Sequence, residues 1–259
     1  MTTIIVISIL IGLIFAPLGC LGLWKRYVYF GDGLAHASML AAVISVLLGI
    51  PIFYAGIINT ALFAFIVFKL KNKSGNNAAI GLTSSLMISF ALILSYIFPS
   101  KFNFTSLLFG DIVIASSRDI ISLSILALFV FVFFFSFYKK IILVIISKDI
   151  ASSRNINVSI IEFIFLSLLS FSVLVTIKIV GALLVTSIIL IPAMSARIIS
   201  TSPLMMIILS VIFAQIMNAF GIALSLYADL PFAPIIILCG GGIFIIISIY
   251  NKLKKMSIF

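Results

Sequence analysis

Charged side chains are scarce in this chain, and acidic residues and histidine are the scarcest of all. Only 8% of the 259 residues are charged, six are Asp or Glu, and one is His. A water-soluble globular protein carries about 25% charged residues, so the composition excludes one. A single histidine also excludes a multi-histidine zinc enzyme. The two cysteines, Cys20 and Cys239, form no CxxC pair and are expected to be small buried hydrophobic residues.

Motifs for ATP hydrolysis and for nucleophilic catalysis are missing as well. No segment matches GxxxxGK followed by Ser or Thr, so the chain has no phosphate loop with which to bind and split ATP. No HExxH motif and no Ser/His/Asp arrangement occurs. A membrane-embedded enzyme or an assembly scaffold therefore has little support, and we expect no permanently bound cofactor.

Long apolar runs take up most of the chain. Hydrophobic residues make up 64% of it, and several runs approach the roughly 20 residues that cross a bilayer as an α-helix. Backbone groups in lipid must be satisfied within such a segment. We therefore predict an all-α, polytopic transmembrane helix bundle with eight or nine spans, forming one domain over residues 1–259. The candidate spans are residues 4–23, 32–49, 52–69, 79–98, 119–138, 159–178, 180–199, 204–226 and 232–250.

The net charge of +10 reflects membrane topology and predicts no nucleic-acid partner. Basic residues cluster in the gaps between apolar runs and at the end of the chain, at positions 25–26, 69–73, 139–154, 197 and 252–255. Basic loops stay on the cytoplasmic side of a membrane, so these clusters predict an outer N-terminus and a cytoplasmic C-terminus. Lys101, Arg118 and Lys178 are isolated exceptions.

Asp32 and His36 are the most informative residues because they lie four positions apart inside an apolar segment. Positions i and i+4 share one face of an α-helix. Ionisable groups at membrane depth are expensive and by default indicate a functional site. A carboxylate with a neutral imidazole suits a divalent cation such as zinc. Two alternatives remain: a polar pair in which Asp32 caps the helix, or a proton relay in a secondary transporter.

Other polar residues have ordinary explanations. Asp111 follows a glycine and Asp229 precedes the last span, and both positions are typical of turns. Glu162 begins a span, where a helix N-terminus stabilises a carboxylate. Residues 139–158 predict either a small surface helix that contacts another protein or a solvated connector. Residues 178–193 mix small residues with a proline, which predicts either a moving, pore-lining helix or tight static packing.

Four sequence blocks carry a family resemblance. They are YFGDGLAHAS at residues 29–38, LFGD at 108–111, VGALLVT through IPA and AR at 180–197, and YAD with two prolines at 227–234. In this order they resemble the permeases of zinc and manganese ABC importers, and most of all the high-affinity zinc uptake permeases. One departure is the segment 155–157, where relatives often carry a glycine.

The resemblance implies a permease of the bacterial inner membrane that works as a homodimer among membrane lipids. A metal-binding protein outside the cytoplasm would deliver zinc, or else manganese or iron, and a separate cytoplasmic ABC ATPase would drive transport. Asp32 and His36 match the polar transmembrane positions of the family, Asp111 matches its outer motif, and Asp229 is a weaker candidate for contact with the metal. The segment containing Ser147, Lys148, Asp149 and Ala151 matches the segment that docks on the ATPase.

Overall fold

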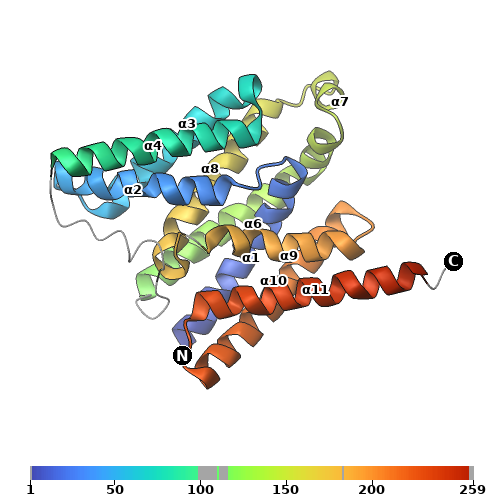
Figure 1. Cartoon of the computed structure of the whole chain (residues 1–259). Coiled ribbons are helices and arrows are strands. Elements are labelled where there is room, and N and C mark those ends of the chain that lie inside the picture. The colour runs from blue at the N-terminus through green and yellow to red at the C-terminus, as the bar shows by residue number, and fades with distance from the viewer. Residues whose placement is uncertain (1, 99–109, 111–115, 183, 257–259) are drawn as a thin grey trace.

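The computed structural model describes residues 2–98, 110, 116–182 and 184–256, which form ten helices and no strand (Figure 1). The predicted all-α fold is therefore confirmed over the described residues. The helices are α1 (Thr2–Trp24), α2 (Phe30–Leu48), α3 (Ile52–Ser74), α4 (Asn76–Ile97), α6 (Ser117–Ile146), α7 (Lys148–Ser153), α8 (Val158–Val180), α9 (Val185–Ile199), α10 (Pro203–Ala228) and α11 (Phe232–Met256).

Eight of the ten described helices are long and apolar enough to cross a membrane; the six-residue α7 and the apolar α9 are shorter. The span expected at residues 180–199 is thus a 15-residue helix. It begins late because Gly181, with φ of +87°, ends α8 in a backbone conformation that favours glycine. The sequence left the count at eight or nine, and the structure gives eight long helices plus this short one.

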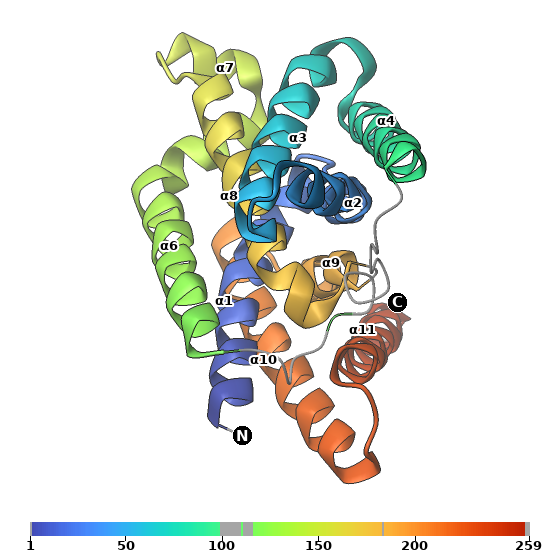
Figure 2. The same ribbon diagram turned by 90° about the vertical axis from the view of Figure 1, so that its left-hand side faces the viewer.

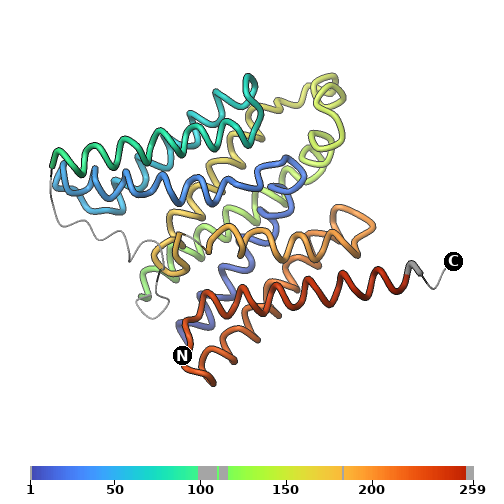
Figure 3. The backbone as a smooth tube through the Cα atoms, viewed as in Figure 1, coloured from blue at the N-terminus to red at the C-terminus, as the bar shows by residue number. Residues whose placement is uncertain are grey.

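The chain runs back and forth between two ends of the bundle. One end holds α7, the α3–α4 turn, the α1–α2 connection and the α9–α10 loop, and the end of α11 lies on the same side (Figures 1 and 3). The start of α1 and the α10–α11 turn lie at the opposite end (Figure 1). The segments that carry most of the basic clusters are therefore gathered at the end that contains α7.

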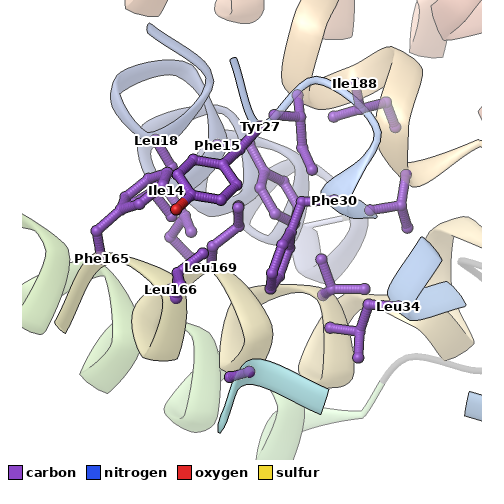
Figure 4. Close-up of a cluster of buried hydrophobic side chains, with 14 of the residues drawn as sticks. Ile14, Phe15, Leu18, Tyr27, Phe30, Leu34, Phe165, Leu166, Leu169 and Ile188 are labelled. Atoms are coloured by element: carbon purple, nitrogen blue, oxygen red, sulfur yellow. The ribbon is translucent and has the colours of Figure 1, made fainter. Parts of the chain in front are cut away.

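Two groups of helices flank a central set. Helices α2, α3 and α4 pack on one another, and α2 and α3 also pack on α8; α9, α10 and α11 pack together, and α9 and α10 also pack against α1 (Figure 2). Helix α6 lies against α1 and α8. Large side chains from α1, α2, α8 and α9 fill the junction between the groups, among them Phe15, Phe30 and Phe165 (Figure 4). Because lipid is as apolar as these side chains, dense packing holds them together more than escape from solvent does.

Ile189 of α9 packs closely against glycines of both α1 and α2. A Cβ on Gly19 of α1 would stand 3.1 Å from the carbonyl carbon of Ile189 and closer still to its oxygen. A Cβ on Gly31 of α2 would stand 3.1 Å from Ile189 Cδ1 and 3.0 Å from Thr186 Oγ1. The two glycines therefore let three helices approach closely, as small residues do in membrane bundles.

Candidate metal site and coupling segment

Asp32 and His36 lie side by side in the first two turns of α2. His36 Nε2 stands 3.8 Å from Asp32 Oδ1, which is longer than a hydrogen bond but close enough for both atoms to face one ion. Tyr29 precedes the helix as its N-cap residue and makes no side-chain capping bond, and Asp32 lies inside the first turn. The predicted shared face is therefore present, and the structure does not support Asp32 as a helix cap.

The Asp32 and His36 side chains are partly exposed, although the residues around them in α2 are tightly packed. The Asp32 side chain is 44% exposed and that of His36 is 37% exposed, although the neighbouring Gly31, Gly33 and Ala35 are buried. A Cβ on Gly33 would stand 2.5 Å from Ile80 Cγ2 of α4, so α2 cannot rotate freely. Nδ1 of His36 is buried and has no hydrogen-bond partner among the described residues. A carboxylate and an imidazole are thus held at the surface of one chain within a membrane-spanning helix.

The other two predicted metal contacts are not assembled with this pair. Asp229 is the exposed C-cap of α10, in the left-handed conformation with φ of +52°. Asp111 lies outside the described residues. Across the described part of the chain, no three His, Cys, Asp or Glu side chains gather to hold a metal ion. One chain therefore offers the Asp32/His36 pair as its candidate site, and the roles of Asp111 and Asp229 stay predictions.

Gly110, the residue before Asp111, packs against the break between α8 and α9. A Cβ on it would stand 2.6 Å from the carbonyl carbon of Val180 and 2.8 Å from Gly181 Cα. Its φ of +63° also favours glycine. Just beyond the break, Ala182 packs with Ala35, the neighbour of His36. The glycine of the predicted outer motif therefore contacts the α8–α9 break, which in turn packs on α2.

The predicted coupling segment forms the short helix α7. Ser147 caps it, since the backbone N–H of Ile150 donates to Ser147 Oγ at 3.4 Å. Lys148 and Asp149 are exposed, while Ala151 is fully buried. Asn155 takes φ of +56°, a conformation that asparagine tolerates in place of glycine, so the bend before α8 forms. The small surface helix is confirmed, and its contact with another protein stays a prediction.

Glu162 anchors an ion-pair cluster that sequence reasoning missed. Its side chain is 7% exposed, and Oε1 lies 3.2 Å from Lys25 Nζ and 3.7 Å from Lys148 Nζ. Oε2 pairs with Lys71 Nζ. Stabilisation by a helix N-terminus is therefore an insufficient explanation for this residue. Lys25 and Lys71 are remote in sequence, and the one available signal was that their basic clusters and Glu162 were all expected on the cytoplasmic side.

Lys25 also makes hydrogen bonds that connect the end of α6 and the start of α4 to this cluster. Its Nζ donates to the carbonyl oxygen of Val144 at 3.0 Å, and its own carbonyl oxygen accepts from Asn76 Nδ2 at 2.6 Å. Burial lowers the pKa of the Lys25 amine, and the charge of Glu162 opposes that change. The ends of α1, α3 and α6 and the starts of α4, α7 and α8 therefore meet around one carboxylate.

A second ion pair joins α6 and α8 away from this cluster. The sequence predicted an isolated Lys178, but its Nζ lies 2.5 Å from Asp119 Oδ1. Asp119 Oδ2 accepts from the backbone nitrogen and the hydroxyl of Ser116 at 2.8 and 2.9 Å, which closes a capping box on α6. A cavity of about 160 Å³ adjoins the pair and is lined by Ser38 of α2 and Leu174 of α8 among others.

Comparisons with known proteins agree with this architecture. Residues 1–251 match the profile of the ABC 3 transport family. The chain is 30% identical over 253 residues to the high-affinity zinc uptake system membrane protein ZnuB of Buchnera aphidicola subsp. Baizongia pistaciae, covering 96% of this chain and 95% of that one. It is 23% identical to the manganese import system permease protein ScaB of Streptococcus parasanguinis, covering 97% and 90%.

A solved structure has the same fold. It is described as PsaBC from Streptococcus pneumoniae in complex with Fab, and it superimposes with a TM-score of 0.82 at 23% sequence identity, covering 98% of this chain and 94% of that one. The family profile spans nearly the whole sequence. This multi-pass membrane protein belongs to the ABC 3 transport family.

Proposed function

We propose that this chain is the permease subunit of an ABC importer that moves divalent transition-metal ions, zinc first among them, into the cytoplasm. The observation that carries the proposal is the half-exposed Asp32/His36 pair on a membrane-spanning helix of an ABC 3 family member. Carboxylate and imidazole together are ligands for zinc and its first-row neighbours. Relatives named as zinc uptake proteins support zinc.

The exposure of the pair supports a homodimer. Ionisable side chains within membrane-spanning helices almost always face other protein or a water-filled cavity and not lipid, so this surface needs a polar cover. A second copy of the chain related by a two-fold axis would bring an identical pair against it. Two carboxylates and two imidazoles would then supply the four ligands that zinc prefers. The two ligands of one chain would be half of the site.

Transport follows from this arrangement if the ligand spacing changes during the cycle. An extracytoplasmic metal-binding protein delivers the ion to the outer side. A separate cytoplasmic ATPase binds α7 through its exposed face, which includes Lys148 and Asp149, and closes when it binds ATP. The closure moves the helices, separates the two pairs and releases the ion inward. A site of this kind must bind the ion well enough to strip part of its hydration and weakly enough to let it go.

ATP-driven metal uptake tests the proposal. The permease, its ATPase and the binding protein are reconstituted in liposomes, and uptake of zinc, manganese and iron is measured in competition. We expect zinc uptake that requires ATP and stops when the phosphate loop of the ATPase is inactivated. Uptake that persists with the inactive ATPase and follows a proton gradient would refute the proposal and favour a secondary transporter. Preference for manganese or iron would correct the cargo alone.

A further inference from the structure

The buried carboxylate of Glu162 pairs with three lysines from three separate parts of the chain. Lys71 on α3 is 4% exposed and Lys25 is 11% exposed, so water screens these two contacts poorly. Lys148 on α7 is 61% exposed, because its side chain reaches in from the surface. A buried carboxylate in this position cannot leave one lysine without a rearrangement of the others.

The Glu162 cluster connects α7, which forms the predicted coupling segment, to elements that adjoin α2, the helix that carries Asp32 and His36. Lys148 is the first residue of α7, and Glu162 follows on α8. Lys71 lies in the last turn of α3, which packs against both α2 and α8. Lys25 directly follows α1 and begins the short connection to α2. The Glu162 carboxylate therefore contacts α7, which is expected to bind the ATPase, as well as the α1–α2 connection and α3, which precede and follow α2 in the chain.

Packed aromatic rings extend this connection from Glu162 to the turn of α2 that carries Asp32. Tyr27, in the connection between α1 and α2, is 3% exposed, and its ring centroid lies 5.9 Å from that of Phe165, one turn after Glu162. The Tyr27 ring also lies 6.4 Å from the ring of Phe30, the first residue of α2. Figure 4 shows these rings in one cluster. Contacts therefore run without a gap from α7 through Glu162 to the turn that carries Asp32.

We propose that Glu162 is a positioning residue that transmits displacement of α7 to the Asp32/His36 pair through the contact of its carboxylate with Lys148, Lys25 and Lys71. This inference rests on the proposed function, since it requires an ATPase that acts on α7. Glu162 itself does not touch the metal. Without its charge, three lysines repel one another at the end of the bundle, and α7 moves without drawing the α1–α2 connection and α3 along.

The test is the number of metal ions transported per ATP hydrolysed, measured on the complete transporter in liposomes. For Glu162→Gln we expect this ratio to fall at least about fivefold, the lower limit of typical coupling between sites, while ATP hydrolysis continues. Lys148→Gln should lower the ratio in the same direction. Lys139→Gln is the matched control, because it removes an exposed lysine from the end of α6 that lies outside the cluster. It should leave the ratio unchanged.

Each outcome decides the matter. An unchanged ratio in Glu162→Gln would overturn the proposal. If Glu162→Gln fails to assemble with the ATPase, Lys148→Gln decides, because the Lys148 side chain is 61% exposed and its loss should cost little folding stability. A lowered ratio with the ATPase still bound supports the proposal, and an unchanged ratio overturns it. An equal fall in Lys139→Gln would also overturn it, since the effect would then follow surface charge. If the unaltered transporter moves no metal with ATP, it is the proposed function that fails.

Discussion

Replacing Gly19 with alanine should destabilise the protein because α1 and α9 approach most closely there. The added Cβ would overlap the carbonyl oxygen of Ile189, which is backbone and cannot rotate away. Overpacking of this kind costs about 1–3 kcal/mol. Gly22 is the matched control on the same helix, since a Cβ there would meet nothing within 4 Å. Both changes raise helix propensity by about 1 kcal/mol, so the difference between the two variants isolates the clash.

The assay is thermal unfolding of the purified protein in detergent, followed by loss of monodispersity. At about 2–4 °C per kcal/mol, Gly19→Ala should lose its fold roughly 2–12 °C below Gly22→Ala. Zinc uptake should fall as well, because the displaced Ile189 also packs on Gly31, the neighbour of Asp32. Equal unfolding temperatures for the two alanine variants would refute the close contact between α1 and α9.

Two further substitutions test other contacts. Asp119→Asn should lower the free energy of unfolding by about 1 kcal/mol, because it weakens both the α6 cap and the partly exposed ion pair with Lys178. Arg118→Gln, at the neighbouring position, is the control and should change that free energy by less than about 0.5 kcal/mol. Equal effects on the unfolding temperature would contradict the pairing. Asn59→Leu should leave that temperature unchanged or raise it. The bond that Asn59 Nδ2 donates to the carbonyl oxygen of Ala37 is worth about 0.6 kcal/mol, whereas its buried Oδ1, which has no partner in the described part of the chain, costs about 1–3 kcal/mol. A marked loss of stability would show that Oδ1 has a partner in the working protein.

Much of the fold follows from the sequence because a small number of physical constraints determine membrane-spanning segments. Apolar length predicted the long helices, and the spacing of Asp32 and His36 predicted their shared face. The length of α9 was missed because its hydropathy is continuous with that of α8, and the break depends on the backbone conformation of Gly181. Periodicity carries no information about a single left-handed residue.

The ion pairs were harder to predict than the helices. Glu162 meets Lys25 and Lys71 through tertiary packing of α8 against α1 and α3, and no local spacing encodes such partners. Lys178 seemed isolated for the same reason, since Asp119 lies on a different helix. The sequence could assign these groups to one side of the membrane, but it could not pair them. The metal-binding role proposed for Asp32 and His36 likewise rests on family resemblance, with helix geometry as its support.

Zinc binding by the purified transporter tests the central claim most directly. The number of zinc ions bound per two chains is measured at equilibrium for the unaltered protein and for His36→Ala and Asp32→Ala at equal purity and folding. Two-fold pairing of Asp32 and His36 predicts one tightly bound ion per two chains in the unaltered protein and none in either variant. An undiminished ion in both variants would contradict the account, because the zinc would then be held by other residues.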